Sequence, residues 1–144
     1  MRIESRLTNP QNYDGIRLED IKYIVIQNID NKFSPHYHIK DGKAIQIIPD
    51  DNMSDSVNGG KLNICGTLHG ICTKYNSISI GVCDNLSKED KKVCVNLVMT
   101  LKQRYNVEKN NIIRKKDVTG ALEPTEWHND KNWIEEMVNQ IIEL

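Results

Sequence analysis

The stretch Tyr23-Ile24-Val25-Ile26-Gln27-Asn28 decides the fold. From Ile21 to Ile26 the chain is apolar except at Lys22 and Tyr23. A short apolar run of this kind is typical of a strand that is buried on both faces, as in a sheet sandwiched by helices. The sequence therefore predicts a central strand over residues 21–26.

Three further segments carry strand signals. Residues 36–39 and 44–48 flank Asp41-Gly42, a dipeptide that favours a tight hairpin turn. Apolar side chains alternate over residues 77–82, and residues 112–114 form a short apolar run. Between them, residues 49–76 are rich in Asn, Asp, Ser and Gly, which predicts a long loop.

Two segments have helical spacing. Ser87 is placed to cap a helix, with Asp90 as a weak variant of the capping box. Asp130 is expected to cap a last helix. The predicted buried stripe of the first helix is Val93, Cys94, Leu97, Val98, Leu101 and Tyr105, and that of the second is Trp133, Ile134, Met137, Val138, Ile141 and Ile142.

Composition sets broad limits on function. The 144 residues predict one domain, residues 1–144, of the α/β class with a mixed sheet flanked by helices. A net charge of -1 favours neither nucleic acid nor an anionic membrane as a partner. The sequence shows no signal peptide and no membrane-spanning apolar run, so we expect a cytoplasmic protein with reduced cysteines.

Six segments carry a resemblance to a known family: Leu18–Ile26, Ser34–Gly42, Ile45–Asp51, Asn76–Val82, Ile113–Pro124 and Lys131–Trp133. In this order they resemble the zinc-dependent N-acetylmuramoyl-L-alanine amidases, a family that includes endolysin amidases of Gram-positive bacteria and their phages and the peptidoglycan recognition proteins. The resemblance implies an amidase-like fold. It also implies a zinc ion on two histidines and one cysteine or acid, with an activated water as fourth ligand.

The resemblance places unsuitable residues at the zinc-ligand positions. Gln27 stands at the first histidine, Lys115 at the second, and Glu123 at the cysteine. The interval from Lys115 to Glu123 keeps the family spacing, so we predict that zinc is absent. As a hypothesis, Lys115 pairs with Glu123 and Gln27 hydrogen-bonds nearby, forming a polar crosslink. The alternative is that all three side chains are solvated and contribute little.

Other positions depart from the family pattern as well. Gly81 stands where the family often has a general-base Glu, and Ala121 where it has a Lys. Pro35 replaces a Tyr found in some members, and Asp55-Ser56 replaces a Trp-His pair. Only six residues separate Gln27 from Ser34, where most relatives insert a longer segment with a helix.

Five residues remain as possible groove or binding residues, and each has a structural alternative. A strand histidine is more often a hydrogen-bonded structural group than a ligand contact. The tryptophan either stacks on a ligand or covers the core, and the arginine either binds or fixes its loop. These five are His36, Asp55, Asn76, Arg114 and Trp127.

A second metal hypothesis concerns the long loop. Cys65, His69 and Cys72 form a Cys-x3-His-x2-Cys cluster, and His36, His38 and Cys83 are candidates to lie close to it. The spacing matches no recognised zinc finger, and reduced cysteines are commonly inert small hydrophobes.

Taken together, the residues predict a pseudoenzyme: an amidase fold without zinc or hydrolysis, kept for binding or regulation. Its expected target is a peptidoglycan fragment or a protein partner such as a cell-wall hydrolase or an identical subunit. A protein partner would dock where the shortened segment exposes the sheet. The alternative is an active amidase that uses unrecognised ligands and cuts between N-acetylmuramic acid and L-Ala.

Overall fold

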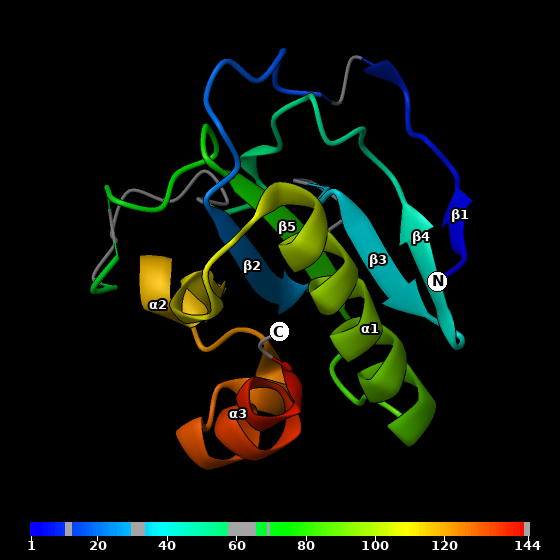
Figure 1. Ribbon diagram of the computed structural model, residues 1–144, viewed down its shortest axis with the longest axis vertical. Coiled ribbons are helices and arrows are strands. Elements are labelled where there is room, and N and C mark those ends of the chain that lie inside the picture. The colour runs from blue at the N-terminus through cyan, green and yellow to red at the C-terminus, as the bar shows by residue number, and fades with distance from the viewer. Residues whose placement is uncertain (11–12, 30–33, 58–65, 69, 143–144) are drawn as a thin grey trace.

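Six strands form one mixed sheet in the order β1-β4-β3-β5-β2-β6 (Figure 1). The computed structural model describes residues 1–10, 13–29, 34–57, 66–68 and 70–142. Only β3 and β4 pair antiparallel; the other four pairs are parallel. The strands are β1 (Ile3–Ser5), β2 (Tyr23–Asn28), β3 (Tyr37–Lys40), β4 (Lys43–Gln46), β5 (Ser77–Val82) and β6 (Ile112–Arg114).

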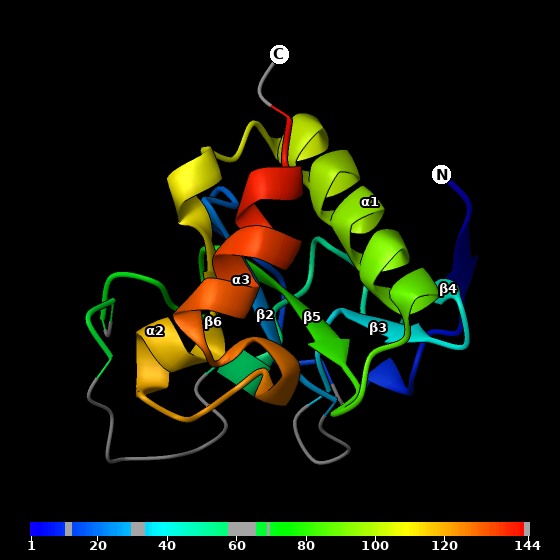
Figure 2. The same ribbon diagram turned by 90° about the horizontal axis from the view of Figure 1, so that it is seen from below.

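Helices cover both faces of the sheet (Figure 2). On one face, α1 (Lys88–Tyr105) and α3 (Asp130–Glu136) pack on the main core, which includes Ile24 and Ile26. On the other, α2 (Lys115–Thr119) and Cys72 enclose Val25 in a smaller cluster. Short 3-10 turns complete the chain: η2 (Asp55–Val57), η3 (Lys109–Asn111), η4 (Thr125–Trp127) and η5 (Val138–Gln140).

The central strands confirm the strongest sequence signals. β5 spans the predicted residues 77–82, and all six are buried. β2 begins and ends two residues later than predicted, so Gln27 lies inside the strand and pairs with Gly81. β2 is buried from Ile24 to Gln27, as β5 is along its whole length.

The predicted hairpin forms, and its turn is fastened to α1. Asp41 and Gly42 both have positive φ, 52° and 71°, which glycine tolerates best. A Cβ on Gly42 would lie 2.7 Å from a carboxylate oxygen of Glu89. Ser87 caps α1 as predicted, accepting from the Asp90 backbone N–H at 3.0 Å. The Asp90 carboxylate instead accepts from the Gly42 N–H at 2.7 Å, so it does not serve the predicted capping box.

The last helix differs from the prediction in two ways. Asn129, not Asp130, is the cap, and its side chain accepts from the Lys131 N–H at 2.8 Å. The helix ends at Glu136 and η5 follows, which breaks the regular helical spacing. Ile134, within the helix, and Ile142, after η5, are 46% and 65% exposed, whereas the rest of the predicted stripe is buried or partly buried.

Two elements carry no clear sequence signal. β1 pairs with β4 at the sheet edge but is only three residues long and flanked by charges. α2 begins directly after β6, so Lys115 is the first residue of a five-residue helix. Within the described residues, no helix is both long and apolar enough to cross a membrane.

Candidate functional site at the strand ends

Three polar side chains lie at or close to the carboxyl ends of β2 and β6. Ile26 pairs with Arg114, and Gln27 and Lys115 are the residues that follow them in the chain. The Lys115 ammonium lies 3.8 Å from a carboxylate oxygen of Glu123. The other Glu123 oxygen accepts from the backbone N–H of Asn28 at 3.1 Å. We call Gln27, Lys115 and Glu123 the strand-end trio.

The trio is buried but incompletely hydrogen-bonded. The Gln27 side chain is fully buried, and those of Lys115 and Glu123 are 3% and 23% exposed. The expected ion pair is therefore present, but its 3.8 Å separation is too long for a hydrogen bond. The expected hydrogen bond of Gln27 is not formed: neither amide atom has a partner in the described part of the chain.

The donor set of the trio does not fit zinc. Protein zinc sites use Cys, His, Asp and Glu side chains. Glu123 offers one carboxylate and Gln27 a neutral amide oxygen, whereas the Lys115 ammonium has no lone pair to donate. Across residues 1–10, 13–29, 34–57, 66–68 and 70–142, no group of three or more His, Cys, Asp or Glu side chains could hold a metal ion.

Pro35 and Gly81 lie against one another beside the trio. A Cβ built on Gly81 would lie 2.8 Å from Cγ of Pro35 and 3.2 Å from Cα of Ile29. The proline ring thus fills the space that a longer side chain at position 81 would need. Ala121 belongs to the turn after α2, where its N–H donates to the Thr119 hydroxyl at 3.1 Å.

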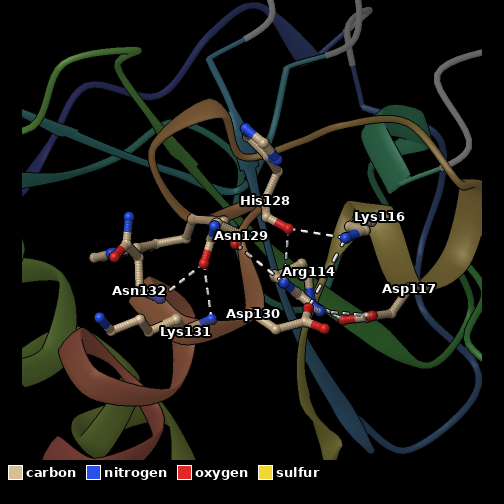
Figure 3. A network of polar contacts seen from close by, with 9 residues as sticks. Arg114, Lys116, Asp117, His128, Asn129, Asp130, Lys131 and Asn132 are labelled. Carbon is tan, nitrogen blue, oxygen red and sulfur yellow. Dashed lines mark hydrogen bonds and ion pairs between the residues drawn. The ribbon is translucent and has the colours of Figure 1, made fainter.

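Arg114 holds together the segment that follows the trio (Figure 3). Its guanidinium donates to the carbonyls of Trp127 and His128, each at 3.1 Å. It also pairs with Asp117 at 3.2 Å and with Asp130 at 2.9 Å. The hydrogen bond from Arg114 lowers the pKa of Asp130. Arg114 is buried, so it acts as a fixed structural hub in this structure.

Trp127 is part of the core. It is fully buried and meets Trp133 edge to face, with ring centroids 5.9 Å apart. Its indole N–H donates to Glu136 at 3.2 Å. Lys91 of α1 then bridges Glu136 at 2.6 Å and Glu126 at 3.0 Å. These contacts bind η4 and α3 to α1, and they leave Trp127 no surface for stacking on a ligand.

His36 is buried in a hydrogen-bonded network that we call the His36 cluster, comprising His36, Ser79, Asn52 and Arg17. The Ser79 backbone N–H donates to Nδ1 at 3.1 Å, so Nδ1 carries no proton. Nε2–H therefore donates to the Asn52 carbonyl at 2.8 Å. Arg17 also donates to that carbonyl, at 3.1 Å. Burial lowers the pKa of His36 to about 4, and the Arg17 charge adds to this shift.

The other two groove candidates lie on the loop side of the sheet. Asn76 is buried, and its side chain accepts from the Thr73 N–H at 2.9 Å and donates to the Ile71 carbonyl at 3.0 Å. Asp55 is partly exposed and forms a long ion pair with Lys74, at 4.0 Å. Neither residue is brought to the strand-end trio by a described contact.

The second metal hypothesis can be examined only for Cys72, Cys83, His36 and His38, because Cys65 and His69 lie outside the described residues. Cys72 is buried, and burial raises the pKa of its thiol to about 12, which disfavours the thiolate form that binds metals. Cys83 donates weakly to the Asn85 carbonyl at 3.6 Å. Burial lowers the pKa of His38, whose Nε2 has no partner among the described residues.

Sequence reasoning missed a further polar hub at Asp50. Its carboxylate accepts from the Tyr37 hydroxyl at 2.6 Å and from the Tyr105 hydroxyl, and it pairs with Arg104 at 3.4 Å. Burial and the Asp50 hydrogen bond raise the pKa of Tyr105 to about 12. The partners come from β3 and α1, so no local sequence pattern could have revealed the hub.

Several grooves lie along α1. One, of about 530 Å³, runs between α1 and the segment containing α3 and η5. Its lining includes Lys88, Met99 and Glu135. None of the trio lines this groove.

Solved structures resemble this chain over most of its length. The structure of PlyL is 20% identical, with 99% of this chain and 98% of PlyL covered and a TM-score of 0.71. A mutant endolysin from Bacillus subtilis is 18% identical, with 98% and 99% covered and a TM-score of 0.78. The N-acetylmuramoyl-L-alanine amidase LysC from Clostridium intestinale is 16% identical, with 86% and 89% covered and a TM-score of 0.57.

No protein-family model and no curated protein matches the chain. At identities of 16–20%, the structural likeness is evidence of fold alone. It agrees with the single α/β domain and six-stranded mixed sheet described above. The chain therefore has the fold of the N-acetylmuramoyl-L-alanine amidases.

Proposed function

We propose that this chain is a catalytically inactive amidase-fold protein that binds its target without cutting it. The observation that carries the proposal is the buried Lys115 ammonium, which lies 3.8 Å from a carboxylate oxygen of Glu123. In the amidase resemblance these are the three zinc-ligand positions. A cation there repels a divalent metal and supplies no lone pair.

The surroundings of the trio support the same conclusion. The ring of Pro35 fills the space beside Gly81, at the position where the family often carries a general-base carboxylate. A Glu at that position would require Pro35 and Ile29 to move. Loss of the metal donors and loss of the base are separate changes, and each removes a different part of the hydrolytic reaction.

The proposed target is a peptidoglycan fragment. Ligand binding can survive the loss of catalysis, because binding the ground state does not require transition-state stabilisation. A protein partner, including a second copy of this chain, is the competing target. We further propose that the protein acts in the cytoplasm, where soluble wall fragments would be its ligands.

Zinc content and wall hydrolysis test the proposal together. The purified protein should contain under about a tenth of an equivalent of zinc and release no new N-terminal L-Ala from sacculi, while it pellets with them. Stoichiometric zinc with chelator-sensitive release would establish an active amidase instead. A protein that neither pellets nor hydrolyses, but forms a dimer or captures one specific protein, would favour the partner.

A restored variant serves as the matched control. Gln27→His, Lys115→His and Glu123→Cys together recreate the two histidines and one cysteine that hold zinc in the family. This triple variant should take up about one equivalent of zinc. If it folds but binds no zinc, the assignment of these positions to the metal site is wrong. Hydrolysis is not expected, because Pro35 and Gly81 remain.

A further inference from the structure

β1 forms an open edge of the sheet (Figure 1). It is the first strand in the sheet order, and its residues are exposed or partly exposed, whereas β6 at the other end of the order is buried along its length. On its inner side β1 pairs with β4. The N–H groups of Arg6 and Thr8 continue this pairing, because each donates at 2.9 Å to a carbonyl of Gln46 or Ile47. The chain therefore follows β4 from Ile3 as far as Thr8.

The outer side of this segment carries backbone groups that no strand of the described sheet pairs with. Successive N–H groups of a strand point to opposite sides, so those of Ile3, Ser5 and Leu7 face away from β4. A row of such groups is a template for pairing with the strand of another chain. The side chain of Leu7 is also exposed, although it is apolar.

Two charged side chains determine which strand can pair there. Glu4 and Arg6 project from the same face of the segment, and their charged groups lie 2.9 Å apart. Charged side chains usually protect a sheet edge, because like charges meet when two copies of the edge pair. This edge carries one charge of each sign, two residues apart. It is therefore complementary to a copy of itself in one register.

We propose that β1 pairs antiparallel with β1 of a second copy of this chain, with the twofold axis at Ser5. In this register Ile3 lies opposite Leu7 of the second copy, and Glu4 lies opposite Arg6. The outward-facing N–H groups of both copies then face one another and form the hydrogen-bonded ladder. Each glutamate also meets an arginine directly across the pair, where opposite charges stabilise the contact.

The side chains select this register over its neighbours. A twofold axis at Glu4 would place the two copies of Glu4 opposite each other, and an axis at Arg6 would do the same with the two arginines; like charges destabilise such pairs. The axis at Ser5 also brings Leu7 against Ile3, which packs on the main core cluster. It thus covers an apolar side chain that a single copy leaves exposed.

The pairing goes beyond the proposed function and leaves the strand-end trio free. In the sheet order, β4, β3 and β5 separate β1 from β2, the strand that carries Gln27. The two sheets would run continuously through both copies, with one trio near each outer end. A dimer of this kind is compatible with binding of a wall fragment by either copy.

Sedimentation of charge-reversed variants tests the pairing. The wild type should form a dimer with a dissociation constant at or below about 1 mM, since the paired segment is short. Arg6→Glu places glutamates of the two copies opposite each other, and Glu4→Arg does the same with arginines. Each should weaken dimerisation at least about tenfold, because the twofold axis doubles the repulsion. Lys131→Glu, an exposed charge reversal on α3, is the matched control and should leave the dimer intact.

Two further measurements identify the interface itself. An equimolar mixture of Arg6→Glu and Glu4→Arg chains should form a mixed dimer, because the glutamates of one chain then face the arginines of the other. In Ser5→Cys, the two thiols lie at the axis, with Cα atoms about 5.5 Å apart, which suits a disulfide. Oxidation should therefore link Ser5→Cys chains in pairs and leave the wild type unlinked. Circular dichroism checks that each variant keeps the fold.

Several results would overturn the pairing. These are a wild type that stays monomeric at about 1 mM, a dimer that the charge reversals leave unchanged, a mixture without mixed dimers, and crosslinking by Ile3→Cys in place of Ser5→Cys. Zinc content and sacculus hydrolysis, which test the proposed function, do not depend on β1. The two proposals can therefore fail separately.

Discussion

The His36 cluster and the strand-end trio are both buried, yet they differ in how well their polar groups are satisfied. Both ring nitrogens of His36 have hydrogen-bond partners, at 3.1 Å and 2.8 Å. Gln27 has none among the described residues, and Lys115 meets Glu123 only at 3.8 Å. A fully paired buried network rigidifies a fold, whereas a partly paired one costs stability. The difference indicates that the His36 cluster stabilises the fold, whereas the strand-end trio is the better candidate for a binding site.

The largest loss of stability should come from replacing Arg114, another buried residue whose polar groups are hydrogen-bonded. Arg114→Met leaves Asp117 and the carbonyls of Trp127 and His128 without their buried donor. Breaking a buried pair from one side costs about 3–5 kcal/mol, so urea denaturation should show a loss of that size. Lys116→Met is the control, because it removes a partly exposed donor to the same His128 carbonyl.

For Lys116→Met we expect a loss below about 1 kcal/mol. If both variants lose the same stability, Arg114 is not the hub that the contacts indicate. The comparison between satisfied and unsatisfied clusters would then rest on the His36 cluster alone.

The His36 cluster should make stability fall in acid. The pKa of His36 is about 4 in the folded chain and 6.5 when unperturbed, so the unfolded chain binds the extra proton first as pH falls. Stability should therefore drop by about 3 kcal/mol between pH 6.5 and pH 4 and show no further loss from this group below that range. Arg17 opposes protonation, whereas Asp50 and the Asn52 carbonyl favour it.

Denaturation midpoints measured across this pH range check the prediction. His36→Asn lacks the titrating ring, so its stability should change less between pH 6.5 and pH 4 than that of the wild type. His38 has a pKa lowered in the same direction and remains in both proteins, so its contribution cancels in the comparison. If the two proteins show identical stability profiles over this pH range, protonation of His36 does not cause the loss of stability in acid.

Local sequence signals predicted much of the fold, because each depended on neighbouring residues. The alternation at 77–82 gave β5, and Asp41-Gly42 gave the hairpin. β1 was missed because three residues between charges show no pattern. At the last helix, Asn129 and Asp130 are both good caps, and sequence alone chose the wrong one.

The site was harder to predict, because its contacts join distant parts of the chain. The ion pair between Lys115 and Glu123 was predicted only because the resemblance places both residues at zinc-ligand positions, which must lie close together in the fold. Nothing local showed that Trp127 would be buried against Trp133 or that Arg114 would bind carbonyls 13 and 14 residues away. The unpartnered amide of Gln27 is visible only once its neighbours are placed.

A smaller loss of stability is expected from Gly81→Ala, which tests how tightly the trio's surroundings are packed. The new methyl group would lie 2.8 Å from Pro35 Cγ, and overpacking of this kind costs about 1–3 kcal/mol. Pro35→Ala removes most of the ring, so the double variant should lose less than the sum of the single variants. Additive losses in urea denaturation would show that the two residues do not compete for one space.

The smallest effect should come from the trio itself. Glu123→Gln leaves the Lys115 ammonium without its carboxylate, but the pair is 3.8 Å apart and Glu123 is partly exposed, so the loss should be about 1 kcal/mol. Adding Lys115→Met should recover that loss, because an apolar side chain replaces a buried charge without cost. Urea denaturation of the single and double variants measures both steps. If Glu123→Gln costs as much as Arg114→Met, the trio is a structural crosslink like the other buried clusters, and its unsatisfied groups no longer indicate a ligand.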